Sequence, residues 1–380
     1  MNRTSRIIST YSADVFGVCS ALFELGGMVI MHDASGCNST YTTHDEPRWY
    51  DMESMVYISG LSEMEAIMGD DEKLISDIVA AAEDLKPKFI AVAGTPIPTM
   101  TGFDFEAVAA LIEERTGIPA FGFSTTGMNT YVSGAGMALE AIARRFTDKA
   151  VSKTAAPSAN ILGLTPLDFS VNGTDDSIAR FLEDSGYQVI SRWAMGSTLE
   201  ELTQAGSAHV NLVVSASGLG AARALKELFG IPYVVGIPIG RDYTEQLRNA
   251  LTDAVQTGEN QFPLSDLPGD DILIIGEAVS SLSLASALEC AAGKGTTVLC
   301  PTEYGPELLR SKDLQFQSEV EIQQAMAQAK LVIADPLYKP ICPREIPFLE
   351  LPSEAFSGRL FRDRIPNLIS DFQFYFREVL

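Results

Sequence analysis

The sequence lacks the features that mark nucleotide-hydrolysing, membrane-spanning or disulfide-bonded proteins. Its 380 residues contain no GxxxxGK[ST] string and no GxGxxG directly after a predicted strand, so we expect no ATP hydrolysis by this chain. No stretch approaches the ~20 consecutive apolar residues that span a bilayer. The first residues show no apolar core followed by a cleavage site. The five cysteines are an odd number at irregular spacing, which disfavours a disulfide framework.

Positive charge is also scarce. Lys and Arg number 27 against 50 Asp and Glu, which gives a formal net charge of −23. Such a surface repels nucleic acids and anionic membranes, so neither is expected as a partner. A hydrophobic content of 46% is typical of a soluble globular protein. The composition therefore predicts a cytoplasmic protein.

Short β-rich runs alternate with amphipathic helical stretches almost throughout the chain, a pattern typical of parallel α/β layers. Buried strands are expected at 28–33, 54–59 and 89–94, and a helix at 62–85 with Ser62 as its cap. At this length the chain exceeds one ordinary core. We therefore predict an α/β protein of three consecutive Rossmann-like domains with parallel sheets around a central cleft.

Two polar, proline-containing linkers separate the predicted domains, at 148–160 and 257–271. The C-terminal stretch has the pattern of an amphipathic helix and is expected to pack back on the first domain. The predicted limits are 1–155 for the first domain, 156–266 for the second, 267–359 for the third and 360–380 for the returning helix.

Open α/β sheets bind ligands in the turns at the carboxyl ends of their strands. Small residues in these turns allow close backbone approach, and each following helix offers its N-terminus to an anion. The candidate turns are DASGC (33–37), GTPIPTMTG (94–102), LTPLDFSVNG (164–173), SASGLG (215–220) and GEAVSS (276–281).

Several of these stretches together resemble one family. MHDASGC resembles the glycine-flanked cysteine loop of nitrogenase component 1, and ISGLSEMEAIMGDDEKLISDI and KPKFIAVAGTPIPTMTGFDF are similar to the segments that follow it there. The resemblance runs in order from about residue 12 to 360. It implies an iron–sulfur ligand at Cys37 beside Gly36, and three Rossmann-like domains in a homodimer or a heterodimer with a related subunit. It also implies a separate ATP-dependent iron–sulfur reductase as electron donor.

The sequence departs from this family at the other cluster ligands. Thr95 stands where the family has a cysteine, and a hydroxyl binds iron more weakly than a thiolate. Cys19 lies 18 residues before Cys37, about two helical turns from the expected position. Asp14 is a conceivable carboxylate ligand. We expect a [4Fe–4S] cluster at a dimer interface, held by Cys37 and Cys19 of both chains; the alternative is a relative whose site has lost its cluster.

Three further side chains near this loop are candidates for chemistry. His44 could donate protons to a substrate reduced one electron at a time, and Arg48 could pair with a substrate carboxylate. The alternative for both is an ion-paired surface loop. His32, at the end of a predicted strand, either hydrogen bonds near the cluster or is a satisfied strand-end imidazole.

These expectations together predict a nitrogenase-like reductase component. It would accept electrons from the ATP-dependent partner and reduce a substrate in the cleft through the interface cluster. The alternatives are a non-catalytic scaffold for assembly of a metallocofactor or tetrapyrrole, and a homologue without a cluster that binds a small molecule.

Overall fold

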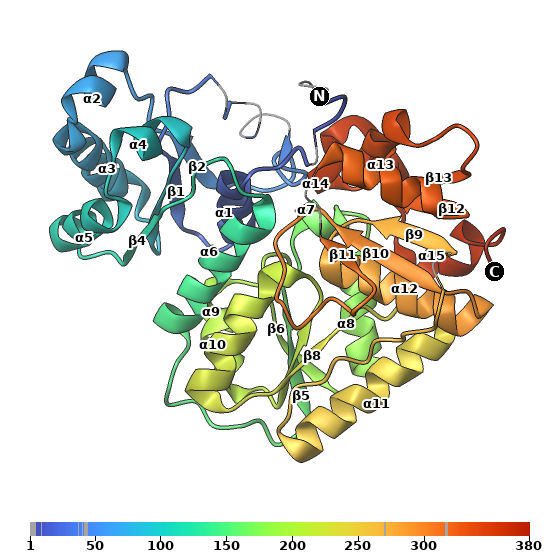
Figure 1. Cartoon of the computed structure of the whole chain (residues 1–380). Coiled ribbons are helices and arrows are strands. Elements are labelled where there is room, and N and C mark those ends of the chain that lie inside the picture. Colours follow the sequence, from blue (N-terminus) through green and yellow to red (C-terminus); the bar gives the residue numbers. More distant parts are fainter. Residues whose placement is uncertain are drawn as a thin grey trace.

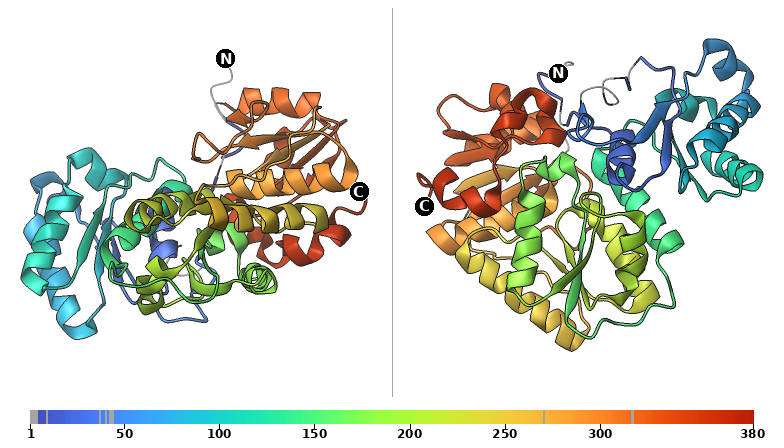
Figure 2. Two further views of the ribbon diagram at one scale, coloured as in Figure 1. Left: turned by 90° about the horizontal axis from the view of Figure 1, so that it is seen from below. Right: turned by 180° about the vertical axis from the view of Figure 1, so that it is seen from behind.

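The computed structural model describes residues 5–8, 10–36, 38–39, 41, 45–269, 271–315 and 318–380. Within these residues the chain forms three parallel β-sheets, each flanked by helices (Figure 1). The predicted α/β class with parallel sheets is therefore confirmed. We call each sheet with its helices a unit. The first and third units lie on opposite sides of the second in every view (Figure 2). The residue limits predicted for the three domains stay a prediction.

The helices and strands of the first unit are α1 (Asp14–Leu22), β1 (Met28–Met31), β2 (Met55–Ile58), α2 (Glu63–Met68), α3 (Asp71–Leu85), β3 (Ile90–Ala93), α4 (Pro96–Thr101), α5 (Phe105–Thr116), β4 (Ala120–Phe123) and α6 (Tyr131–Phe146). Those of the second unit are β5 (Ser158–Leu162), α7 (Pro166–Phe169), α8 (Thr174–Asp184), β6 (Gln188–Arg192), α9 (Leu199–Thr203), β7 (Val210–Val213), α10 (Leu219–Phe229), β8 (Tyr233–Val235) and α11 (Arg241–Thr257). Those of the third unit and the tail are β9 (Ile272–Ile275), α12 (Ala278–Ala292), β10 (Thr296–Cys300), β11 (Leu314–Gln315), α13 (Glu319–Gln328), β12 (Leu331–Ala334), β13 (Phe348–Glu350), α14 (Glu354–Ser357) and α15 (Leu368–Tyr375).

The first strand of each sheet in chain order is an interior strand. The strands that follow are added on one side of it first, and later strands are added on its other side. The orders are β2-β1-β3-β4, β6-β5-β7-β8 and β11-β10-β9-β12-β13. The direction of winding therefore changes between β1 and β3, between β5 and β7, and between β9 and β12. Loops that leave neighbouring strands in opposite directions open a crevice at the carboxyl ends, where such folds bind ligands.

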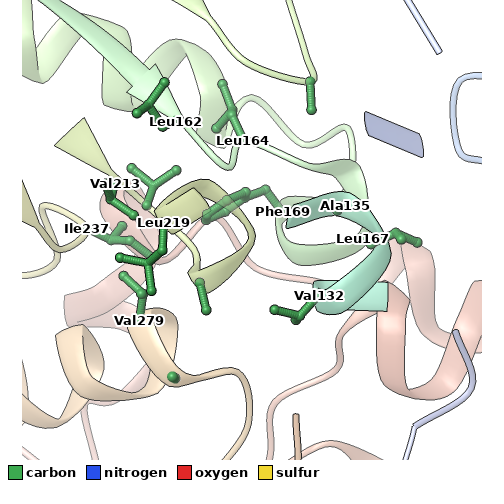
Figure 3. Close-up of a cluster of buried hydrophobic side chains, with 14 of the residues drawn as sticks. Val132, Ala135, Leu162, Leu164, Leu167, Phe169, Val213, Leu219, Ile237 and Val279 are labelled. Carbon is green, nitrogen blue, oxygen red and sulfur yellow. The ribbon is translucent and has the colours of Figure 1, made fainter. Parts of the chain in front are cut away.

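One continuous apolar core joins the three units. It includes residues of all three sheets together with α1, α6, α10 and α12. Figure 3 shows part of it, where Val132 of α6, Leu162 and Val213 of the second sheet and Val279 of α12 lie around one cluster. A smaller core fills the other face of the first sheet beneath α3 and α5. The units therefore share packing, which limits their independent movement.

The helix expected over 62–85 is divided into α2 and α3. Ser62 and Glu65 form the predicted capping box at its start. Gly69 then adopts a left-handed conformation with φ of 71°, and Asp70 caps the second helix by accepting from the Lys73 N–H. A glycine in this conformation ends a helix at little steric cost.

The C-terminal stretch contacts more than one unit. Arg362 donates to the Asp45 carbonyl oxygen of the first unit at 3.0 Å, and the predicted packing of residues 360–380 on that unit stays a prediction. Helix α15 contacts α8, and Asn367 donates a hydrogen bond to the Ser177 hydroxyl at 3.0 Å. The Tyr375 hydroxyl donates to the Glu350 carbonyl oxygen of the third unit. The apolar side chains of the helix therefore cover the junction of the second and third units.

Helices α1 and α6 cross at two glycines. A Cβ at Gly134 would lie 1.8 Å from the Asp14 carbonyl oxygen, and one at Gly17 would lie 2.0 Å from the Tyr131 carbonyl oxygen. Both neighbours are backbone atoms of a packed helix and cannot rotate away. The absence of a side chain at these positions is what brings the helices into contact.

We expect Gly134→Ala to destabilise the protein by about 1–3 kcal/mol, because the added methyl group overpacks this crossing. Gly136→Ala in the same helix is the matched control, since its Cβ would meet only the Ser217 oxygen at 3.6 Å. That variant should leave stability unchanged or raise it, because alanine favours helix over glycine. Urea unfolding of the two variants checks this. Equal stabilities would contradict the conclusion that the helix crossing leaves no room for a side chain at Gly134.

Candidate functional site

A cavity of about 90 Å³ lies where the second and third units meet. The carboxyl ends of strands β8, β9 and β12 and the end of α7 contribute to its walls. The stretch after the last sheet closes it with side chains that include Ile365 and Leu368. Most of the surface is apolar, but three carboxyl groups line it, from Asp168, Glu277 and Asp335. All three follow strands β5, β9 and β12, at the points where their sheets reverse direction.

Asp168 is held by hydroxyl groups. It lies in α7, whose first residue is proline and whose cap is Thr165. The Thr165 hydroxyl donates to Oδ2 of Asp168 at 2.7 Å, and the Tyr131 hydroxyl donates to Oδ1. Burial, reinforced by the nearby Glu277 carboxylate, raises the pKa of Asp168 to about 7. A carboxylic acid that exchanges its proton near neutral pH can serve as a general acid.

Glu277 is tied to the backbone of two units. As the cap of α12 it accepts from the Ser280 N–H at 2.8 Å, and its other oxygen accepts from the Ala216 N–H at 2.8 Å. Burial raises the pKa of Glu277, although the backbone donors act in the opposite direction. This carboxyl group therefore links the end of β7 to the third unit and has less freedom than Asp168.

Asp335 closes the third side of the cavity. Its carboxylate accepts from the Leu337 and Ser353 N–H groups, each at 2.8 Å, and from the Ser357 hydroxyl at 2.9 Å. Burial raises the pKa of Asp335 as well. The backbone contacts show that it organises the loops after β12 and β13, whereas Asp168 is the group best placed to exchange a proton with a ligand.

The residues predicted from the first unit surround the carboxyl ends of β1 and β3. Thr95 caps α4, and its hydroxyl donates to the His32 carbonyl oxygen at 2.8 Å and to Oδ1 of Asp33 at 3.2 Å. A side chain at Gly36 would meet no atom within 4 Å, so the backbone there is open to approach. Cys37 lies outside the described residues, as does His44. Cofactor contacts by Gly36, Cys37 and Thr95 stay predictions.

His32 is buried, and its imidazole packs against Phe103 at an interplanar angle of 43° with ring centroids 4.5 Å apart. The Nδ1 atom shares a hydrogen bond of 2.9 Å with the Ser59 hydroxyl. Burial lowers the pKa of His32 to about 4, against the opposing influence of Asp33. The imidazole is therefore neutral at pH 7, and its catalytic role stays a prediction.

Cys19 and Asp14, the two further predicted metal ligands, have other surroundings. Cys19 is fully buried in α1, and burial raises the pKa of its thiol, with a further contribution from Glu46. Iron binds the thiolate, which such a site disfavours. The Asp14 carboxylate accepts from the N–H groups of Val15, Thr126 and Gly127 at 2.8–2.9 Å.

No group of three or more potential metal ligands occurs among the residues that the structure describes. The described part of the chain therefore does not provide the ligand set of a [4Fe–4S] cluster, which usually needs four thiolates. The interface cluster predicted from the sequence depends on Cys37 and stays a prediction.

Arg48 is enclosed by protein acceptors. Its guanidinium donates to Glu46 at 2.7 and 3.1 Å, to Glu24 at 2.8 Å, and to the carbonyl oxygens of Ser20 and Ala194 at 2.8 and 2.7 Å. The side chain is 4% exposed. Its predicted contact with a substrate carboxylate stays a prediction, and in this structure the guanidinium joins the first unit to the second.

The turns 164–173 and 276–281 were candidates from the sequence, but no residue within them was. Asp168 and Glu277 are the acidic residues that stand among apolar and small residues in these turns. An acidic side chain in the turn after a buried strand was the available signal.

A family model described as nitrogenase component 1 type oxidoreductase matches residues 14–263. The chain therefore belongs to the nitrogenase component 1 type oxidoreductase family, as its motifs predicted. No helix in the described part of the chain is long and apolar enough to cross a membrane.

Curated relatives include two kinds of protein. One component of the light-independent protochlorophyllide reductase of Prosthecochloris aestuarii is 36% identical over 30% of this chain and 22% of its own length. The nitrogenase iron-molybdenum cofactor biosynthesis protein NifE from Clostridium pasteurianum is 28% identical over 47% of this chain and 38% of its own length. NifE from a Nostoc species is 25% identical over 65% of this chain and 50% of its own length. The chain thus spans at most half the length of these relatives.

The fold is shared with a solved structure of nitrogenase Cp1 at pH 6.5. The TM-score is 0.73 at 16% sequence identity, and the match covers 100% of this chain and 94% of the other. At this identity the likeness concerns the fold alone.

Proposed function

We propose that this protein is the substrate-holding component of a nitrogenase-like two-component reductase, with its substrate in the cavity between the second and third units. The observation that carries this proposal is Asp168, a proton-exchanging carboxyl group held by Tyr131 and Thr165 at the wall of a mostly apolar cavity. Electrons would come from a separate ATP-dependent iron–sulfur protein, a role supported by membership of the family.

Reduction of one unsaturated bond consumes two electrons and two protons. In the proposed reaction the partner supplies the electrons, and Asp168 passes protons to the atoms that gain them. After each transfer the Asp168 carboxylate accepts hydrogen bonds from the Tyr131 and Thr165 hydroxyls, which stabilise its charge until it is reprotonated. The apolar walls keep bulk water away from the reacting bond.

An exposed apolar surface on the first unit supports docking of a partner protein. Met64, Ile67 and Met68 of α2 are 67%, 70% and 73% exposed, and Met100 of α4 is 85% exposed. Helices α2 and α4 contact each other, and they follow the carboxyl ends of β2 and β3. A contiguous apolar surface of this kind is typical of an interaction site, and methionine adapts well to a partner. We call these four residues the methionine surface.

We expect Met68→Glu to weaken docking and to slow ATP-dependent electron transfer at least tenfold, because it places a charge in a surface that must lose water. Val320→Glu on α13, where Val320 is 55% exposed, is the matched control and should leave the rate unchanged. The measurement is the oxidation of the reduced iron–sulfur partner from the same source, followed anaerobically by its visible absorbance with ATP and this protein. If this protein does not accelerate that oxidation, the proposed function is wrong.

A scaffold for cofactor assembly is the second candidate. It is favoured by the two NifE relatives, whose name assigns them to cofactor biosynthesis. The same anaerobic reaction separates the candidates. A reductase returns the bound molecule chemically reduced, whereas a scaffold releases it unchanged to an acceptor protein.

A further inference from the structure

The cavity between the second and third units has a composition that selects among ligands. Its walls include the apolar side chains of Phe169, Ile237, Ile274, Leu284 and Phe356. A cavity of about 150 Å³ with comparable walls accommodates benzene. At about 90 Å³ this cavity suits a molecule of roughly three or four non-hydrogen atoms on the same scale, which is far smaller than a tetrapyrrole.

The charge of the lining is of one sign. Of the described residues that form the cavity, three carry carboxyl groups and none is lysine, arginine or histidine. A carboxylate ligand would lose its hydration without gaining a partner of opposite charge, which is strongly unfavourable. An ammonium group, in contrast, would find an acceptor for a charge-assisted hydrogen bond.

The three carboxyl groups differ in their capacity to accept this bond. Glu277 and Asp335 each accept two backbone N–H groups and hold loops together. Asp168 instead accepts hydrogen bonds from the side-chain hydroxyls of Tyr131 and Thr165, and a hydrogen bond from Ser215 also lowers its pKa. These hydroxyls continue to donate when Asp168 ionises, so they favour the form that pairs with a cation.

We propose that the cavity binds a small molecule with an apolar body and an ammonium group, which pairs with Asp168, and that it rejects carboxylates of the same size. This inference rests on the proposed function and names the substrate class of that site. Once the pair has formed, the proton that Asp168 exchanges is the one in its hydrogen bond with the ammonium group. A neutral alcohol of the same shape would bind more weakly than the amine, because its hydroxyl makes an uncharged hydrogen bond. The protein's net charge of −23 favours approach of the same class of ligand.

The test compares propylamine, 1-propanol and propionate by isothermal titration calorimetry with the full chain at pH 8, without reductant or partner. We expect the amine to bind at least tenfold more tightly than the alcohol, and propionate not to bind. Asp168→Asn should weaken binding of the amine at least tenfold while changing that of the alcohol less than threefold. Propionate binding as tightly as the amine, or an amine affinity unchanged in Asp168→Asn, would overturn the inference.

A second variant covers the case in which Asp168→Asn does not fold. Leu284→Phe adds volume to the wall of the cavity and should abolish binding of both the amine and the alcohol; amine binding unchanged in this variant would place the ligand elsewhere and overturn the inference. Because no electron transfer is measured, failure here is distinct from failure of the proposed function. If the amine does not bind but partner-dependent turnover requires Asp168, the proposed reductase function is retained and the ammonium substrate class is wrong.

Discussion

Replacing Arg48 with methionine is expected to destabilise the protein by about 3–5 kcal/mol, the range for removal of one partner from a buried ion pair. The guanidinium donates to the carboxylates of Glu46 and Glu24, and the Glu46 side chain has no exposed surface. Without the arginine, the Glu46 charge is left buried, and within the described part of the chain the side-chain donor that remains is the Tyr41 hydroxyl at 2.9 Å. The bond to the Ala194 carbonyl oxygen, which connects two units, is lost as well.

Arg144→Met is the control for this experiment. Arg144 also bridges two glutamates, Glu140 and Glu227, but all three side chains are well exposed. Surface ion pairs contribute about 0–1 kcal/mol, so this variant should unfold close to wild type. Urea unfolding of both variants gives the comparison. Similar urea midpoints for the two variants would show that the buried contacts of Arg48 do not stabilise the fold. Arg48 would then again be a candidate for ligand binding.

Asp168→Asn is expected to reduce partner-dependent substrate reduction by about 10²–10⁴-fold, the usual contribution of a general acid. Asparagine keeps the size of the side chain and can still hydrogen bond to Tyr131 and Thr165, but it supplies no proton. The wild-type rate should fall as pH rises through about 7, because the carboxyl group then loses its proton. The residual activity of the variant should lack this dependence. An unchanged rate would exclude Asp168 as the acid.

The same variant has a consequence for stability that needs no partner. Burial raises the pKa of Asp168 from 3.8 to about 7, so between these pH values the folded state holds a proton that the unfolded state releases. The contribution of this group to the free energy of unfolding is therefore fully present below about pH 4 and is lost as pH rises to 7. It amounts to about 1.4 kcal/mol for each pH unit by which the pKa of the folded state exceeds that of the unfolded state. The free energy of unfolding in urea should change less between pH 5 and pH 8 for Asp168→Asn than for wild type. Asp176→Asn, at an exposed carboxylate, should behave as wild type.

Much of the fold was predictable because hydrophobic runs and turn residues are local signals. The strands at 28–33 and 89–94 were expected from continuous apolar runs, and both occur within a residue or two as β1 and β3. The short strands β11 and β13 were missed, since two or three residues carry no periodicity. The contact of the C-terminal helix with α8 was not predictable, because an amphipathic pattern indicates that one face is buried but not which surface covers it.

The candidate site was only partly predictable for a related reason. Charged residues near Arg48 were visible in the sequence, but Glu24 and the Ala194 carbonyl oxygen reach it only through tertiary structure. Tyr131 and Asp168 are 37 residues apart and come from different units. The spacing of residues along the chain does not predict such a pair. The turns that hold Asp168 and Glu277, in contrast, were predicted from the strand pattern.

The wall formed by Ile365, Pro366 and Leu368 comes after all three sheets in the order of the chain. During synthesis, the sheets emerge from the ribosome before this wall exists. A growing polypeptide therefore has an open groove at the junction and gains its enclosed chamber only when the final segment folds over it.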